Sequence, residues 1–169
     1  MKMERLNLTM SLLFDDMKKM TDEGREIPIR WSAMHMYSCA QLAKLLAFHR
    51  NIDPELAGMS AALHDIVIIY TGKRGNHAEL SVKYICDFIE RFNNGPWTKI
   101  PKISKKEADT LIHAITRHSQ KDIYSYDPLT ELLKDVDTLD RYLHGVKENR
   151  EDYIKRCSKV LVELGIMQQ

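Results

Sequence analysis

Hydrophobic residues recur at spacings of three and four along most of the chain, and no segment alternates apolar and polar residues as a half-buried strand would. Glycine and proline are sparse and gather between the periodic stretches. This pattern predicts an all-α fold, a bundle of about six to seven helices. The expected helices cover roughly residues 4–21, 31–50, 53–69, 77–92, 104–120, 127–145 and 149–164.

Local signals support several of these helix starts. Asp53 is a suitable N-cap with Pro54 at the first helical position. Ser104 followed three residues later by Glu107 forms a capping-box pattern. The stretch 57–62 is small side chains almost throughout, which allows neighbouring helices to approach on several sides. We therefore expect the helix over 53–69 at the centre of the bundle.

The composition fits one domain over 1–169, with a core of about 28–145 on which the N-terminal and C-terminal helices pack. Lysine and arginine number 25 against 24 acidic residues, so no global basic field favours a nucleic acid duplex. Three scattered cysteines without a CxxC pair fit a reducing compartment, and we expect a cytoplasmic protein. No apolar run approaches the roughly 20 residues that span a bilayer, so no membrane association is expected. The oligomeric state stays open.

The dipeptide His64-Asp65 lies in the otherwise small and apolar stretch of the central helix. A buried carboxylate beside an imidazole is costly unless it is paired or bound to a metal ion. The alternative is a pair at a helix end that caps a neighbour or makes one salt bridge. The dyad alone does not decide between these interpretations.

His35 shares a packed stripe of its helix with Cys39, Leu42 and Leu46, so its imidazole points along the core. By itself it fits a buried core histidine as well as a metal ligand. The other ligand-type residues of the chain decide how it is interpreted.

Two acids of the helix over 127–145, Asp135 and Asp137, flank its apolar stripe on opposite sides, and periodicity does not choose between them. Asp140 falls within the stripe on the side of Asp137. Two acids there would repel each other unless a cation or a donor were present. This favours Asp137 as a ligand.

The order His35, His64-Asp65 and Asp137 on successive helices, with the last acid in Val136-Asp137-Thr138-Leu139-Asp140, resembles the HD superfamily of metal-dependent phosphohydrolases. The resemblance spans about 35–140 and implies an HD-domain helical bundle. It also implies that His35, His64, Asp65 and Asp137 hold one divalent ion. The family's usual Ala-Asp-Arg-Leu context keeps its apolar-Asp-x-Leu frame here but loses the basic residue.

Two further histidines, His77 and His118, complete an order that resembles the dinuclear members of the superfamily. There the Asp of the dyad, here Asp65, bridges two ions and the intermediate histidines hold the second. In mononuclear relatives such histidines contact substrate phosphate instead. Both alternatives remain, as does a role in the core or surface alone. His113 lies off the inner face of its helix and is expected to be exposed.

Two imidazoles and two carboxylates suit Mn²⁺, Fe²⁺, Ni²⁺, Co²⁺ or Zn²⁺, with one ion expected and a second site if His77 and His118 are ligands. Such an ion polarises a phosphoryl group and lowers the pKa of bound water towards about 7. Asp65 would orient or deprotonate that water as the catalytic residue.

Lys73 and Arg74 directly precede His77 near a helix N-terminus, which makes them the first candidates to bind substrate phosphate. Arg117 and Lys121 are further candidates beside His118, or solvated surface charges.

The resemblance implies hydrolysis of a phosphomonoester or phosphoanhydride bond in a nucleotide or a similar small molecule. Two other functions fit the same residues. One is a di-iron HD-type oxygenase, which iron content and an oxygen-sensitive spectrum would indicate. The other is a non-catalytic nucleotide-binding HD module, which would bind metal without cleaving phosphate esters.

Overall fold

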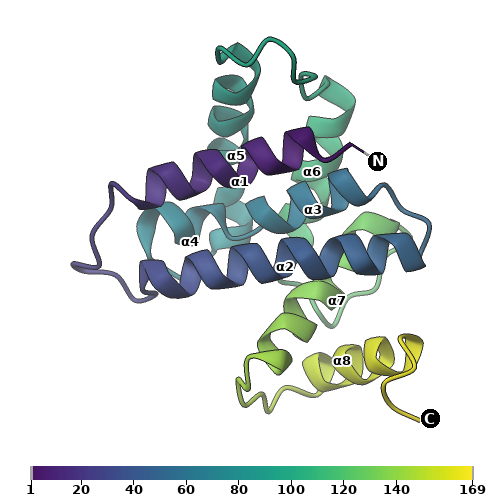
Figure 1. The fold of residues 1–169 in the computed structure, drawn as a ribbon. Helices are drawn as coiled ribbons and strands as arrows, with labels where there is room; N and C mark the ends of the chain where they lie inside the picture. Colours follow the sequence, from purple (N-terminus) through teal and green to yellow (C-terminus); the bar gives the residue numbers. More distant parts are fainter. Residues whose placement is uncertain (1, 169) are drawn as a thin grey trace.

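The computed structural model describes residues 2–168, and these fold into eight α-helices without a strand (Figure 1). The helices are α1 (Glu4–Met17), α2 (Ile29–His49), α3 (Pro54–Leu63), α4 (Ile66–Thr71), α5 (His77–Asn94), α6 (Lys105–Arg117), α7 (Pro128–Leu143) and α8 (Glu151–Glu163). The predicted all-α class is confirmed. The single helix predicted over 53–69 is two helices, α3 and α4, so residues 2–168 form eight helices where seven ranges were predicted.

The prediction of one continuous helix over 53–69 is wrong, because the chain breaks between α3 and α4 at the His64-Asp65 dyad. Asp65 leaves the helical conformation, with φ −102° and ψ 26°. The His64 ring bonds the carbonyl of Ala61, which an uninterrupted helix would pair with the Asp65 amide. Apolar residues continue on both sides of the break, so periodicity did not reveal it.

The central position predicted for the small-residue helix is confirmed, since α3 packs against α1, α2, α6 and α7. Gly58 permits the close approach of α1: a Cβ atom at this position would lie 2.5 Å from Cδ2 of Leu6. Leu6 is fully buried, so α1 is seated on α3 through a contact that a larger side chain would displace.

The predicted helix starts at Asp53 and Ser104 are confirmed by their hydrogen bonds. Asp53 accepts from two amides of the first turn of α3. Ser104 and Glu107 form a reciprocal capping box at the start of α6. Asp127 caps α7 by accepting hydrogen bonds from the amide and the hydroxyl of Thr130. These short signals fix the ends of helices that carry site residues.

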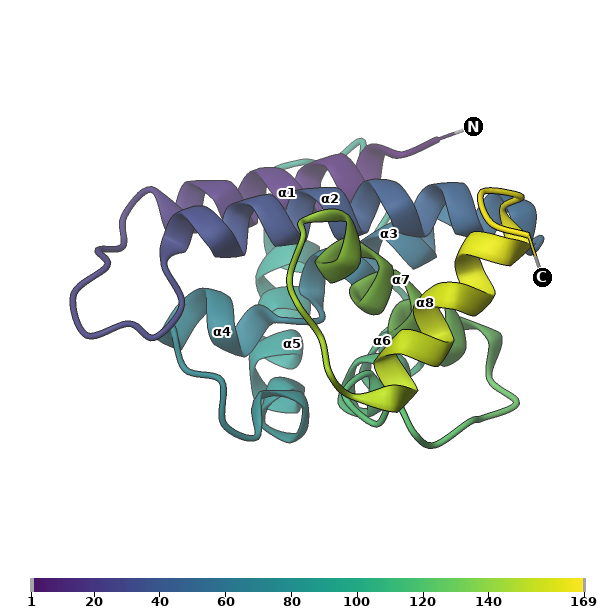
Figure 2. The same ribbon diagram turned by 90° about the horizontal axis from the view of Figure 1, so that it is seen from below.

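The first helix ends at Met17 rather than near residue 21, because the amides of Lys19 and Met20 bond carbonyls three residues earlier and close a tight turn. At the other end of the chain, α8 packs against α7 (Figure 2). The single-domain organisation over 1–169 stays a prediction. Within residues 2–168, no helix combines the length and hydropathy needed to cross a membrane.

Candidate metal centre

Four histidines and two aspartates from five different parts of the bundle meet in one place. They are His35 of α2, His64 and Asp65 at the α3–α4 break, His77 at the start of α5, His118 at the end of α6 and Asp137 of α7. We call these six residues the histidine–aspartate cluster. All of them except His64 line a cavity of about 210 Å³, and His64 lies fully buried behind it.

Asp65 stands between two halves of this cluster. Its Oδ2 lies 3.5 Å from Nε2 of His35 and 3.6 Å from Nε2 of His64. Its Oδ1 lies 3.2 Å from Nε2 of His77 and 3.6 Å from Nε2 of His118. Each carboxylate oxygen therefore faces its own pair of imidazole nitrogens.

Asp137 completes only the first half. Its Oδ1 lies 3.3 Å from Nε2 of His35 and 3.9 Å from Nε2 of His64. The first half thus offers two imidazoles and two carboxylates, and the second half offers two imidazoles and the other oxygen of Asp65.

Three of the histidines are oriented by the same device, a hydrogen bond of 2.7 Å from Nδ1 to the carbonyl three residues earlier. The pairs are His64 with Ala61, His77 with Arg74 and His118 with Ile115. A carbonyl can only accept, so the proton resides on Nδ1 and the neutral ring keeps its lone pair on Nε2. All three lone pairs therefore point into the cluster.

Nitrogen atoms with lone pairs face each other across both halves. The two Nε2 atoms are 3.2 Å apart between His35 and His64, and 3.1 Å apart between His77 and His118. Such contacts are repulsive unless a proton or a metal ion lies between the nitrogens. Ligand atoms of His64, His118 and Asp137 lie within 4.8 Å of one another, as do those of Asp65, His77 and His118. These buried groups can hold a metal ion.

Asp140 supports His35 from behind. Its Oδ2 is 2.5 Å from Nδ1 of His35, and its Oδ1 accepts a hydrogen bond from the hydroxyl of Ser38. This arrangement turns Nε2 of His35 towards Asp65 and Asp137. The sequence placed Asp140 near Asp137 but gave it no function, because helical periodicity does not show which residue of α2 lies opposite.

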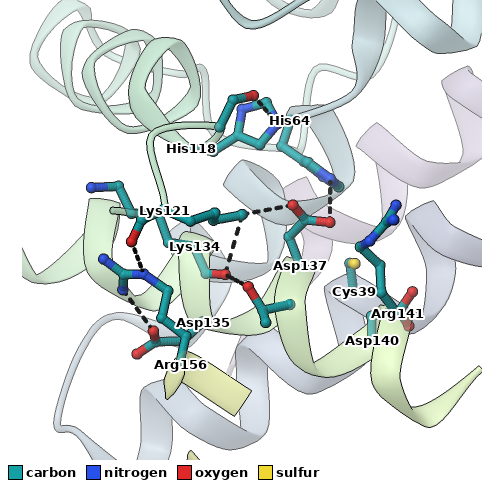
Figure 3. A network of polar contacts seen from close by, with 12 residues as sticks. Cys39, His64, His118, Lys121, Lys134, Asp135, Asp137, Asp140, Arg141 and Arg156 are labelled. Carbon is teal, nitrogen blue, oxygen red and sulfur yellow. Dashed lines mark hydrogen bonds and ion pairs between the residues drawn. The ribbon is translucent and has the colours of Figure 1, made fainter. Parts of the chain in front are cut away.

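Lys121 is buried against Asp137, with 2.6 Å between Nζ and Oδ2 (Figure 3). The interpretation of Lys121 as a phosphate ligand or a solvated charge is therefore wrong. The chain turns back into the bundle after α6 ends at Arg117, which stays exposed as expected for a surface charge. Burial raises the pKa of Asp137, but Lys121, His35 and His64 together hold that pKa well below its usual value. Asp137 is therefore ionised.

Asp135, the alternative to Asp137, lies outside the cluster. Its Oδ1 is 2.9 Å from the guanidinium of Arg156 and its Oδ2 is 2.7 Å from that of Arg50. Figure 3 shows the Asp135–Arg156 pair apart from the Lys121–Asp137 pair. Asp135 is therefore paired with an arginine at the end of α2 and one on α8, and not with the residues of the cluster.

Burial and neighbouring charges give the two residues of the His64-Asp65 dyad different charges. Burial raises the pKa of Asp65, yet the neighbouring imidazoles of His64, His118 and His77 hold it well below its usual value. Burial lowers the pKa of His64 to about 4. The dyad is therefore an ionised carboxylate beside a neutral imidazole, which is the state in which both can bind a cation.

Three arginines line the same cavity, namely Arg74 before α5, Arg141 near the end of α7 and Arg150 at the start of α8. Sequence reasoning selected Arg74 but missed the other two: Arg141 lies one helical turn after Asp137 on α7, and the α7–α8 connection brings Arg150 to the site. Lys73 does not line the cavity, and its ammonium faces Glu26 at 3.7 Å. Of these two neighbouring loop residues, only Arg74 lines the cavity, whereas the side chain of Lys73 lies near Glu26.

A family model for the HD domain matches residues 33–144, a range that contains all six residues of the histidine–aspartate cluster. A search of curated proteins gives no significant match. A search of solved structures also gives none.

Proposed function

The chain belongs to the HD domain family, and on this premise we propose that it is a metal-dependent phosphohydrolase whose first metal ion is held by His35, His64, Asp65 and Asp137. The observation that carries the proposal is the position of Asp65, whose two oxygens each face a pair of imidazole nitrogens. Neutral imidazoles with carboxylates suit Mn²⁺, Fe²⁺, Ni²⁺, Co²⁺ or Zn²⁺.

The second half of the cluster supports a second ion. Nε2 of His77 and Nε2 of His118 both lie on the Oδ1 side of Asp65, and Ser119 Oγ is 3.4 Å and 3.3 Å from them. Three further donors thus surround the space beside the first half. We propose that His77, His118 and Asp65 would hold this second ion, with Asp65 shared between the two sites.

A divalent ion bound here would polarise a phosphoryl oxygen and lower the pKa of a water molecule beside it. The chain itself supplies the remaining functions. Asp65, ionised by its neighbours, would orient the attacking water or accept its proton. Lys121 and Asp140 hold Asp137 and His35 in place without lining the cavity.

We propose a small phosphorylated substrate, such as a nucleotide, cleaved at a phosphomonoester or phosphoanhydride bond. Arg74 lines the cavity together with Asp65 and His77, and none of the acids in residues 2–168 is within ion-pair distance of its guanidinium. A free guanidinium beside a metal centre is suited to a phosphate oxygen.

The bridged geometry would also fit a di-iron oxygenase. Three arginines in the lining of the cavity favour an anionic phosphate over that alternative. Iron content together with oxygen consumption, and no phosphate release, would instead identify an oxygenase. Metal binding without turnover of any phosphate ester or oxidisable substrate would identify a non-catalytic module.

The test is elemental analysis of the purified protein and of Asp65→Ala, followed by a phosphate-release screen of nucleotides with each candidate metal added back. Asp109→Ala is the matched control, because this acid is exposed on α6 and lies outside the cavity lining. The expected result is bound metal and phosphate release in the parent and the control, and neither in Asp65→Ala. A parent protein that binds no transition metal and responds to none would overturn the proposal.

A further inference from the structure

We propose that Arg141 and Arg150, with Arg74 and Ser32, form a second phosphate subsite beside the metal centre, so that the substrate carries two phosphoryl groups rather than one. This inference rests on the proposed function and narrows its substrate to a phosphoanhydride or a bisphosphate. The four residues line the same cavity as the histidine–aspartate cluster, and we call them the arginine rim.

The rim is assembled from separate parts of the chain. Arg74 belongs to the α4–α5 loop, whereas Arg141 and Arg150 flank the α7–α8 connection, which Figure 2 shows running down the face of the bundle between α4 and α8. The guanidinium of Arg150 lies 3.5 Å from the ring centre of Tyr153, which restricts its position. Three guanidinium groups thus meet at one cavity from two sides.

Two polar atoms of the rim lack a partner among the described residues. Nε of Arg141 and Oγ of Ser32 are both buried and make no hydrogen bond. Ser32 is only 5% exposed, so water does not easily compensate its hydroxyl. The residues that carry these two donors line the cavity, and a phosphate group, which supplies several acceptor oxygens in a small volume, suits such a lining.

Among residues 2–168, Glu148 is the only acid that forms an ion pair with a side chain of the rim, while Glu26 accepts a hydrogen bond from the backbone amide of Arg74. Glu148 forms a close ion pair with Arg150 and lies 3.7 Å from Arg141. Three guanidinium groups against this one paired carboxylate leave the side chains of the rim with a net positive charge, which favours an anionic phosphoryl group. The rim therefore remains electrostatically unsatisfied without a ligand.

The metal centre does not need this excess charge for the reacting phosphoryl group. Two divalent ions outweigh the two carboxylates of Asp65 and Asp137, and Lys121 adds a further positive charge. Bound ions would thereby neutralise the reacting group at the cluster. The arginine rim would then bind the neighbouring phosphoryl group. Its position would determine which phosphate bond of the substrate lies next to Asp65.

The test is calorimetric titration of the metal-loaded protein with inorganic phosphate and with methylenediphosphonate, a non-hydrolysable diphosphate analogue. The parent is compared with Arg141→Gln and Arg150→Gln. Arg117→Gln is the matched control, since this exposed guanidinium bonds only atoms of its own helix. Metal content is measured after each titration, because diphosphonates can remove metal ions.

The parent is expected to bind methylenediphosphonate at least about tenfold more tightly than phosphate, given the energy of charge-assisted hydrogen bonds. Each rim variant should lose about tenfold on the diphosphonate and much less on phosphate, with the control unchanged. Equal losses on both ligands, or none, would overturn the second subsite. Arg150 is 53% exposed, so its variant should fold even if Arg141→Gln does not.

This measurement separates the subsite from the proposed function, because binding is recorded without turnover. Selective loss of diphosphonate binding in a protein that cleaves no phosphate ester would support the rim and contradict the hydrolase. Hydrolysis with no difference between the rim variants and Arg117→Gln would support the hydrolase and contradict the rim.

Discussion

Nδ1 of His35 and Oδ2 of Asp140 are 2.5 Å apart in the interior of the bundle, where both residues are at least 95% buried. The hydroxyl of Ser38 donates to the other oxygen of the same carboxylate. Asp140 is therefore fixed on both sides and in turn fixes the His35 ring with Nε2 towards the cluster. Since Asp140 does not line the cavity, it acts as a positioning residue.

Replacing Asp140 with alanine is expected to weaken metal binding by about 10- to 100-fold, because His35 loses the group that sets its tautomer and orientation. The affinity is measured by competition with a chelator of known strength. Circular dichroism of the same samples checks that the helices are retained.

Asp135→Ala is the matched control for Asp140→Ala, because Asp135 is also on α7 and is equally buried, but pairs with Arg50 and Arg156. It should reduce the free energy of unfolding by about 3 kcal/mol and leave metal affinity of the folded protein unchanged. If both variants lost metal affinity equally, Asp140 would have no specific effect on His35.

Lys121→Met removes the ammonium group beside Asp137 and keeps most of the apolar stem. In metal-free protein the buried carboxylate would lose its partner at 2.6 Å, and we expect a loss of about 3–5 kcal/mol in the free energy of unfolding. A metal ion at the cluster supplies a compensating charge, so the loss should be smaller in metal-loaded protein. Urea unfolding with chelator and with metal gives both values, and equal losses would contradict an ion beside Asp137.

His118→Ala tests whether the second half of the cluster holds an ion. We expect metal content to fall from two ions to one per chain, because the remaining half keeps His35, His64 and Asp137 with Asp65. His113→Ala is the control: it removes an exposed histidine of the same helix and should leave two ions. One ion in the parent and in both variants would show that His77 and His118 contact substrate instead.

The local signals of the sequence were sufficient for much of this architecture. Asp53 and Ser104 predict the starts of α3 and α6 because an N-cap residue bonds atoms within one turn of its own helix. The break at Asp65 was not predictable in this manner, since apolar residues continue through it and only the contacts of the dyad explain it.

The same limit applies to the site. The six cluster residues could be selected from the sequence because the HD resemblance gives their order. The contact of Lys121 with Asp137 and the place of Arg150 at the cavity could not be predicted, because each depends on how a loop turns. Arg141 lies on α7 and was not singled out in the sequence. Periodicity likewise could not separate Asp137 from Asp135, which required the arginines of distant helices.

The loop that carries Arg74 and His77 begins at Gly72, which ends α4 in the left-handed conformation with φ +69°. Its carbonyl accepts hydrogen bonds from the amides of Glu26 and Ile27. A Cβ atom on Gly72 would lie 2.6 Å from Cβ of Arg25 and 3.0 Å from its Cα. Residues 25–27 approach the end of α4 closely, and position 72 therefore requires glycine for two reasons. The backbone is left-handed there, and a Cβ atom would collide with Arg25.

Gly72→Ala is expected to cost about 1–2 kcal/mol for the left-handed conformation and about 1–3 kcal/mol more for the contact with Arg25. Gly24→Ala separates the two terms, because Gly24 has the same φ of +69° and nothing within 4 Å of an added Cβ. Chemical denaturation of both variants measures the difference. Because displacement of this loop also moves His77, Gly72→Ala should release the second metal ion more readily, whereas Gly24→Ala should not. Equal stability losses in the two variants would mean that the segment at Arg25 moves aside freely and does not hold the loop in place.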